Sequence, residues 1–147
     1  MFSSKDVAAY IAQECDRLGL DYNNTKIQKL LYCAYGIMLA WKGERICDEY
    51  PRLWPYGPVF PKVFKYINKG KNIATASYNF KELASEDQKI VIERTLAKYG
   101  NYTANALSTW SHSPISPWSR VKEEGGGWNS FIPDEYIAEY FREHVLA

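Results

Sequence analysis

The chain has 147 residues, of which 46% are hydrophobic and 16% aromatic, enough to fill the core of one ordinary domain and too many for a disordered chain. Its 18 Lys and Arg residues nearly balance its 17 Asp and Glu residues, so the net charge of +1 excludes a strong overall attraction to nucleic acid or to a membrane surface. We expect a single domain over residues 1–147 without a membrane span, because no apolar run approaches the roughly 18 residues that a span needs.

The cysteines and the first residues indicate the compartment. Cys15, Cys33 and Cys47 are odd in number and lack Cys-x-x-Cys spacing, which argues against a disulfide framework and against a structural zinc site. A reducing compartment suits such thiols best. The N-terminus, Met1 to Asp6, lacks the charged and then apolar segments of a signal peptide. We therefore expect a cytoplasmic protein.

The charges are distributed unevenly along the chain. Residues 1–73 carry eleven Lys or Arg against seven Asp or Glu, whereas residues 74–147 carry seven against ten. From Glu123 onward, six acids accompany one base, Arg142. The pattern indicates either a basic and an acidic side of the molecule or solvated helix faces that happen to differ.

Two helices are expected in the first 43 residues. The first begins after Ser3 or Ser4, because Ser3 and Asp6 have the spacing of a capping box, and it ends at Gly19. The second is capped by Asn23 or Asn24 and ends near Gly43. Each helix has an apolar stripe at helical spacing, namely Val7, Ala8, Ile11, Ala12 and Cys15 in the first and Ile27, Leu30, Leu31, Ala34, Tyr35, Met38 and Leu39 in the second.

The middle of the chain has a different character. Residues 44–58 contain three prolines and no helical period, which predicts a short hairpin or an ordered loop. A third helix is expected from Pro58–Val59 to Gly70, because proline is tolerated in the first turn of a helix. Its predicted buried face is Phe60, Val63, Phe64 and Ile67, and its predicted opposite face is Lys62, Lys65 and Lys69.

Three further helices are expected in the second half. Residues 71–84 predict a loop or short strand, followed by a helix from Ser85 to Tyr99 with acids in its first turn. Residues 103–110 predict a short helix, 111–118 a loop with two prolines, 125–127 a flexible glycine spacer, and Pro133 the start of the last helix, whose buried face is Tyr136, Ile137, Tyr140 and Phe141. The fold is thus predicted to be mainly α, a compact bundle of about six or seven helices with a small irregular or β-hairpin element near residues 45–57.

Few side chains point to catalysis or metal binding. The two histidines, His112 and His144, have no partner at the spacing of metal ligands, and the glycine run lacks the Lys-Ser/Thr of a phosphate-binding loop. Ser111 and Ser113 flank His112, but a nucleophile next in sequence to its base is not how such sites are usually built, and no Gly-x-Ser-x-Gly motif occurs. We expect no enzyme activity, no cofactor, no metal and no small-molecule substrate.

Aromatic side chains in irregular segments are the strongest indication of a binding function. Trp and Tyr favour interfaces because they bury a large area and keep a polar group, although each could instead fill the core of a small domain. Those in or beside predicted loops are Trp54, Tyr56, Trp110, Trp118 and Trp128. The stripe of Lys62, Lys65 and Lys69 could contact phosphates or be a solvated helix face, and the near-zero net charge argues against nucleic acid.

Several short motifs follow one another in a fixed order. Lys26-Ile-Gln-Lys-Leu-Leu-Tyr32 precedes Ala34-Tyr35-Gly36, and Trp54-Pro-Tyr-Gly-Pro-Val59 follows Gly43-Glu44 and Asp48-Glu49. The later segments are Lys62-Val63-Phe64, Tyr99-Gly100, Leu107-Ser108, His112 and Pro117-Trp118. Together they resemble the motifs of the Panacea domain, the family of SocA-like antitoxins, which include L-Q-K-L-L-Y-x-A-x-G and W-x-Y-G-P-V. The resemblance covers roughly residues 5–120, and Ser111 stands where the family commonly has Thr.

The resemblance implies a bacterial or phage antitoxin that neutralises a toxin encoded beside it by direct protein–protein binding. The toxins of this family are diverse, so the domain would act as a clamp and not as a catalyst. Two other functions stay open: an adaptor that presents its partner to a protease, which needs a second binding surface, and a nucleic-acid-binding regulator, whose affinity would fall steeply with salt.

The residues of these motifs divide into expected scaffold and expected site. Leu30, Leu31, Ala34 and Gly57 are interpreted as core and turn residues. The hypothesis for the partner-binding site is that Trp54, Tyr56, His112 and Trp118 converge on one groove, bordered by Lys29 or Tyr32, with Lys62 and Lys65 as a basic patch. The alternative is that the motif residues form a buried polar network that holds the fold.

Overall fold

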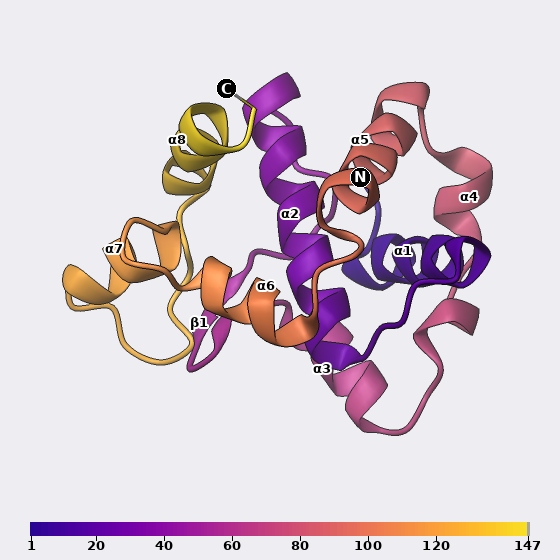
Figure 1. Ribbon diagram of the computed structural model, residues 1–147, viewed down its shortest axis with the longest axis horizontal. Helices are drawn as coiled ribbons and strands as arrows, with labels where there is room; N and C mark the ends of the chain where they lie inside the picture. Colours follow the sequence, from indigo (N-terminus) through magenta and orange to yellow (C-terminus); the bar gives the residue numbers. More distant parts are fainter. Residues whose placement is uncertain (147) are drawn as a thin grey trace.

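The computed structural model describes residues 1–146 and is mainly α-helical (Figure 1). Its helices are α1 (Ser4–Leu18), α2 (Asn24–Lys42), α3 (Pro61–Asn68), α4 (Asn79–Leu83), α5 (Glu86–Tyr99), α6 (Ala104–Ser111), α7 (Pro117–Glu123) and α8 (Asp134–His144), with a 3-10 turn, η1 (Ile73–Thr75), before α4. The strands β1 (Arg52–Trp54) and β2 (Gly57–Val59) form an antiparallel hairpin. The predicted fold class is confirmed, although the described part of the chain has more helices than the six or seven expected.

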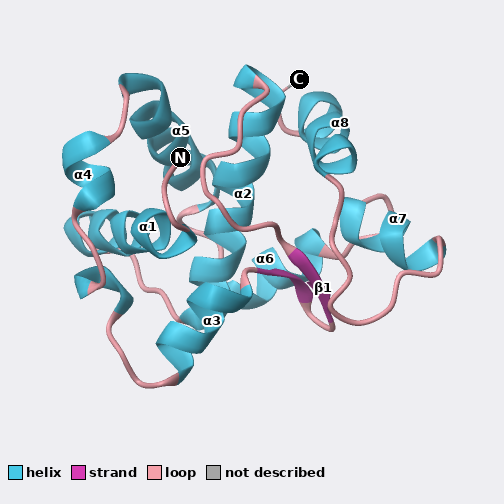
Figure 2. Ribbon diagram, turned by 180° about the vertical axis from the view of Figure 1, so that it is seen from behind, coloured by secondary structure: helices cyan, strands magenta, loops and turns pink. Residues whose placement is uncertain are grey.

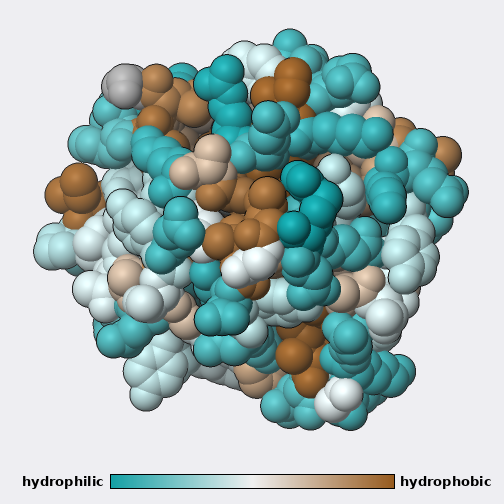
Figure 3. Space-filling model, turned by 45° about the vertical axis from the view of Figure 1, so that its right-hand side comes forward, coloured by the Kyte–Doolittle hydropathy of each residue, from teal (hydrophilic) through white to brown (hydrophobic). Residues whose placement is uncertain are grey.

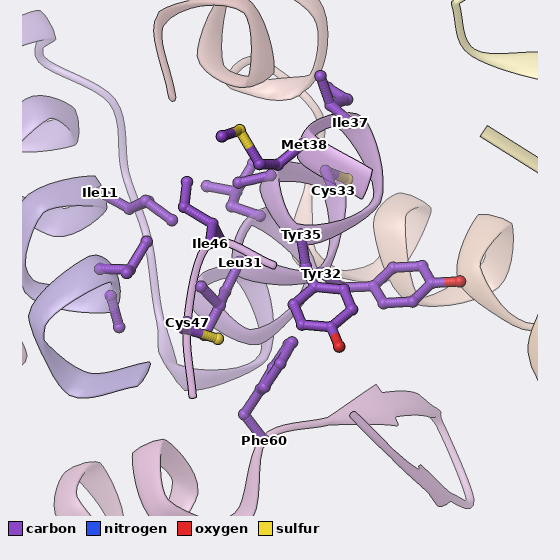
Figure 4. Packing of buried hydrophobic residues seen from close by; sticks show 14 of the residues in the cluster. Ile11, Leu31, Tyr32, Cys33, Tyr35, Ile37, Met38, Ile46, Cys47 and Phe60 are labelled. Atoms are coloured by element: carbon purple, nitrogen blue, oxygen red, sulfur yellow. The ribbon is translucent and has the colours of Figure 1, made fainter. Parts of the chain in front are cut away.

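Helix α2 is the centre of the fold. It contacts α1, α3, α5, α6, α8 and strand β2, and it passes between α1 and α5 on one side and α8 on the other (Figures 1 and 2). Every residue from Lys26 to Leu39 is buried. Figure 4 shows its side chains leaving the helix in several directions, with Phe60 lying beneath Tyr35. The single apolar stripe predicted for this helix was therefore incomplete, because a helix enclosed by partners is buried on every face.

The ends of the long helices follow the predicted caps. Ser3 accepts a hydrogen bond from the backbone N–H of Asp6 at the start of α1, and Asn23 accepts one from Lys26 at the start of α2. Gly19 and Gly43 end these helices in the left-handed conformation, with φ of 70° and 69°. That conformation disfavours residues with a Cβ, so these glycines stop the helices where the sequence predicts.

Three short segments differ from the prediction. Helix α3 begins at Pro61 and not at Pro58, because residues 57–59 pair with β1 as strand β2. Residues 71–84 contain η1 and α4 and no strand. Helix α7 lies partly in the expected 111–118 loop and starts at Pro117, after the cap Ser116. Helices of five to eight residues have too few turns for a periodic pattern to be recognised in the sequence.

Helix α8 is docked on α2 by two contacts. Gly36 of α2 lies against the ring of Phe141, and a Cβ at this position would overlap that ring. The hydroxyl of Tyr35 donates a hydrogen bond of 2.5 Å to Asp134 Oδ1 at the first residue of α8. The predicted face of α8 is buried at Ile137 and Phe141, whereas Tyr136 and Tyr140 are half-buried and the buried Ala138 was not expected.

The outer surface contains scattered apolar groups. On the side that carries α1 and α5, hydrophobic side chains form small groups among hydrophilic ones, with a larger group near the middle (Figure 3). Within residues 1–146, no helix is long and apolar enough to cross a membrane.

Candidate partner-binding site

Two helices hold the first half of the hairpin through its backbone. The indole N–H of Trp118 in α7 donates a hydrogen bond of 2.8 Å to the carbonyl of Trp54. The hydroxyl of Ser108 in α6 donates one of 2.6 Å to the carbonyl of Tyr56. Both donors are buried, so these bonds are shielded from water and fix the backbone on either side of Pro55.

Helix α2 holds the second half of the hairpin in the same way. The amine of Lys29 donates a hydrogen bond of 3.0 Å to the carbonyl of Pro58. The Gln28 side chain donates to the carbonyl of Phe60 at 3.2 Å and accepts from its N–H at 2.7 Å. Four alternate carbonyls, at positions 54, 56, 58 and 60, are thus bound by side chains. At positions 58 and 60, side chains of α2 replace the neighbouring strand that β2 lacks on its outer edge, and all four bonds satisfy backbone acceptors.

On its other edge, the hairpin pairs with the segment that follows the glycine run. The N–H of Leu53 donates to the carbonyl of Ser130 at 2.8 Å, and the N–H of Asn129 donates to the carbonyl of Leu53 at 2.7 Å. Arg52 also forms an isolated antiparallel bridge with Phe131. The hairpin is therefore held from both edges and is a rigid element in spite of its short strands.

The turn of the hairpin is packed tightly against α2 and α6. Gly57 has φ of +115°, and a Cβ at this position would overlap the Ser111 hydroxyl and lie 3.0 Å from Cε of Lys29. Only glycine combines that backbone conformation with so little space. This close approach brings Lys29 within reach of the Pro58 carbonyl.

Lys29 is a buried amine with an unusual environment. Its side chain is almost fully buried, and burial lowers the pKa of its amine from 10.5 to about 8. Its hydrogen-bond acceptor is the neutral carbonyl of Pro58, so no carboxylate compensates the loss of hydration. Burying this amine costs free energy, and the hydrogen bond by which it holds the turn offsets part of that cost.

Four aromatic side chains, two of them exposed and two half-buried, gather at the tip of this hairpin. Trp54, Tyr56, Phe64 and Trp128 make up what we call the hairpin-tip surface. The ring of Trp54 lies 4.9 Å from that of Phe64 and 5.9 Å from that of Trp128, and its indole N–H donates to Asn129 Oδ1. Tyr56 is 75% exposed and Trp128 is 68% exposed. Exposed aromatic side chains that gather in this way are candidates for contact with a partner.

A small pocket opens beside the hairpin-tip surface. It has a volume of about 120 Å³ and lies between the hairpin, α3 and the first turn of α2. Trp54, Tyr56, Val59 and Phe64 form most of its apolar wall, and Asn24 and Thr25 border it. The volume is close to that of a cavity that holds one benzene-sized group, so one side chain of a partner fits.

The structure separates the predicted site residues into two groups. Trp54 and Tyr56 lie on the hairpin-tip surface, and Lys62 and Lys65 are exposed on α3. Of the other four, Lys29 is buried but lines the small pocket together with Trp54 and Tyr56. Tyr32 and Trp118 are buried, His112 is half-buried with its ring 5.4 Å from that of Trp118, and none of these three lines that pocket. Lys29 and Trp118 make hydrogen bonds of the kind that the alternative, a buried polar network, requires, whereas Tyr32 Oη and His112 Nδ1 have no hydrogen-bond partner among residues 1–146.

Some residues that form or support this site were not assigned to it from the sequence. Phe64 was expected on the buried face of its helix, and Asn24 and Ser108 carried no binding hypothesis. An aromatic residue at the edge of a buried stripe and a serine inside a short helix give no signal of their own, because their role depends on the hairpin that lies beside them. In residues 1–146, no group of three or more His, Cys, Asp or Glu side chains could hold a metal ion.

The free energy of unfolding is expected to fall as the pH rises above about 9. Burial raises the pKa of the Cys15 thiol from 9.0 to about 11 and that of Cys47 to about 12, and it raises the pKa values of Cys33 and Tyr32 as well. The unfolded chain loses these protons near the ordinary pKa values, whereas the folded chain keeps them, so stability present at neutral pH is lost on the alkaline side.

Lys29 acts in the opposite direction between about pH 8 and 10.5, where the unfolded chain holds its proton and the folded chain does not. It is one group against several, so the net change remains a loss. Urea unfolding midpoints measured from about pH 7 to about pH 11 test this, and Cys47→Ala should make the decline less steep. A midpoint that stays constant over this range would contradict the expectation.

Comparison with known proteins places most of the chain in one group. The family model described as "Antitoxin SocA-like, Panacea domain" matches residues 27–119, which include the hairpin and all four side chains that hold it. The chain is 30% identical over 155 residues to the curated Antitoxin SocA of Caulobacter vibrioides (strain NA1000 / CB15N), covering 95% of this chain and 82% of that protein. No solved structure matches.

Proposed function

Since this chain belongs to the SocA-like Panacea family of antitoxins, we propose that it neutralises a cognate protein toxin, encoded beside it, by binding that toxin directly. In this proposal the folded domain acts as a binding protein and performs no catalysis. The antitoxin role follows from the family, and the direct binding is supported by the geometry of the hairpin.

The observation that carries the proposal is an exposed aromatic group on a fixed backbone. Tyr56 is 75% exposed, while its own carbonyl is bound by the buried hydroxyl of Ser108. An anchor that is already ordered loses little conformational entropy when a partner binds, so more of its contact energy contributes to affinity. A folded domain that holds Trp54 and Tyr56 in this way is suited to bind a protein surface.

An adaptor role is the second candidate, and one observation favours it. A second apolar pocket, of about 120 Å³, lies between Ile37, Trp41, Ile90 and Leu146, and Trp41 is 44% exposed. Figure 1 shows the end of α2 and the C-terminus, where this pocket lies, at the opposite end of the molecule from the hairpin. An adaptor needs two separate surfaces, one for its partner and one for the protease.

Co-expression with the neighbouring open reading frame tests the proposal. We expect the neighbour alone to stop growth, and co-expression of this chain to restore growth and to yield a stable complex on purification. Because a cognate pair with a nanomolar dissociation constant corresponds to about −12 kcal/mol, the complex should survive size-exclusion chromatography. A neighbour that is not toxic, or that this chain neither binds nor counteracts, would contradict the proposal.

The amount of toxin in the same cells distinguishes sequestration from an adaptor role. Neutralisation by sequestration leaves the amount of toxin unchanged, whereas presentation to a protease lowers it. Under the leading proposal, Trp41→Ala retains full rescue, because Trp41 lies far from the hairpin. Loss of rescue by Trp41→Ala, with the complex intact and the toxin no longer degraded, would favour the adaptor.

A further inference from the structure

The surface around the hairpin tip lacks acidic side chains of its own. Three segments meet there, and none of them, residues 22–43, residues 50–81 or residues 125–133, contains an Asp or a Glu. They supply the first turn of α2, the hairpin with α3, and Trp128. In a chain with 17 acids, these three segments therefore contribute no negative charge to the surface, while they keep their Lys and Arg residues.

Two lysines lie on α3, the helix that also carries Phe64. Lys62 and Lys65 are exposed on α3, and neither forms a salt bridge with any residue in 1–146. The nearest acid in sequence to the hairpin is Glu49, whose two carboxylate oxygens accept from the Ser4 hydroxyl and from the backbone N–H of Lys62. Unpaired lysines beside an aromatic surface attract a partner of opposite charge.

The pocket indicates which kind of side chain a partner would insert here. Its wall of Trp54, Val59 and Phe64 is apolar, and its volume of about 120 Å³ suits one apolar or aromatic side chain. The Asn24 Oδ1 atom, in a residue that borders the pocket, is buried and has no hydrogen-bond partner among the described residues. The pocket thus has a largely apolar wall, with one buried and unpartnered polar atom in a residue at its border.

We infer that the hairpin-tip surface binds an acidic segment of the toxin, in which one apolar or aromatic residue enters the pocket and flanking Asp or Glu residues lie against Lys62 and Lys65. This inference rests on the proposed function and adds the chemistry of the partner to it. The opposite charges orient the two proteins and speed their encounter, and the side chain that enters the pocket contributes most of the affinity.

A nucleic acid would also be attracted to lysines beside aromatic rings. The pocket favours a protein, because its volume suits one side chain and its wall is formed largely by aromatic and aliphatic groups. The overall net charge of +1 is also low for a nucleic-acid-binding domain. The test therefore includes a single-stranded oligonucleotide as a competitor of the toxin.

The test measures binding of the purified toxin to variants of the full chain. Tyr56→Ala is expected to weaken binding at least tenfold, and Lys65→Glu severalfold, with a larger effect at about 0.05 M than at about 0.3 M salt. The matched controls are Tyr78→Ala and Arg142→Glu. The first changes an aromatic residue of 56% exposure just before α4, and the second changes an exposed cation on α8. All four positions are exposed, and thermal unfolding checks that each variant stays folded.

A charge exchange identifies the partner's chemistry. Hydrogen exchange locates the toxin segment that the domain protects, and an Asp or Glu in it is changed to Lys. This toxin variant should bind the wild-type domain severalfold more weakly and regain affinity with Lys65→Glu.

The outcomes separate this inference from the proposed function. If wild-type chain does not bind the toxin, the proposed function fails. If it binds, but Tyr56→Ala and Lys65→Glu weaken binding no more than the two controls, this inference alone is overturned. Displacement of the toxin by a random-sequence oligonucleotide of about 20 nucleotides, with a steep salt dependence, would also overturn it in favour of nucleic acid.

Discussion

Replacing Gly57 by alanine should lower the free energy of unfolding by about 3 kcal/mol. Two costs contribute. The backbone has φ of +115°, a conformation that residues with a Cβ rarely adopt, and the added methyl group would overlap the Ser111 hydroxyl. Lys29 is also 3.0 Å from that position and is held in place by its bond to Pro58, so the neighbours cannot move aside easily. Urea unfolding of the purified variant measures the loss.

Gly43→Ala is the matched control for this variant. Gly43 also has a positive φ, of +69°, but nothing lies within 4 Å of a Cβ built there. Its replacement should cost only the backbone term, about 1 kcal/mol. Equal losses for the two variants would mean that the hairpin turn is not closely packed on α6. A recovery of stability when Ser111→Ala is added to Gly57→Ala would locate the steric conflict at the Ser111 hydroxyl.

Trp118→Ala is expected to destabilise the domain by roughly 3–5 kcal/mol and to free the hairpin backbone. The variant removes a buried indole and leaves the carbonyl of Trp54 without its donor. Trp118→Phe keeps an aromatic ring beside His112 and should cost only about 1–3 kcal/mol, the effect of the lost hydrogen bond. Unfolding midpoints measure the global effect, and hydrogen exchange at residues 52–59 measures the local one.

These variants decide between the two roles considered for Trp118. If Trp118 contacted the toxin directly, Trp118→Ala would leave stability unchanged and weaken the complex. We expect instead that Trp118→Ala lowers stability. Binding then weakens as a consequence, because Trp54 and Tyr56 are no longer held in place. His112→Ala should have a smaller effect on stability, because the ring is only half-buried and its Nδ1 atom has no hydrogen-bond partner in residues 1–146.

The role of the family motifs follows from these contacts. Gln28, Lys29, Ser108 and Trp118 all lie in the matched range of residues 27–119, and all hold the backbone of the hairpin. Exposed side chains such as Tyr56 and Lys65 lie on the scaffold that these residues support. A scaffold of buried motif residues that presents exposed side chains to solvent is consistent with the proposed binding of a protein toxin.

Much of the fold could be predicted from local sequence patterns. Caps such as Ser3 and Asn23, and glycines such as Gly19 and Gly43, act on the nearest turn of the chain, so their effect is visible in the sequence. The three prolines of residues 44–58 excluded a helix, so a short hairpin or an ordered loop was predicted there, and the structure has the hairpin.

The division of the motif residues into scaffold and surface was decided only by the tertiary structure. The sequence by itself indicated the long helices, the non-helical segment that contains the hairpin, and the family, because caps, periodicity and motif order depend on neighbours in the chain. The short helices α4 and α7 were not indicated. The sequence did not show that α2 is enclosed on every face, nor that Lys29 is buried beside the hairpin while Tyr56 is exposed at its tip. Burial depends on which elements pack together, and these contacts join residues 29 to 74 positions apart, such as Lys29 with Pro58 and Lys26 with Gly100.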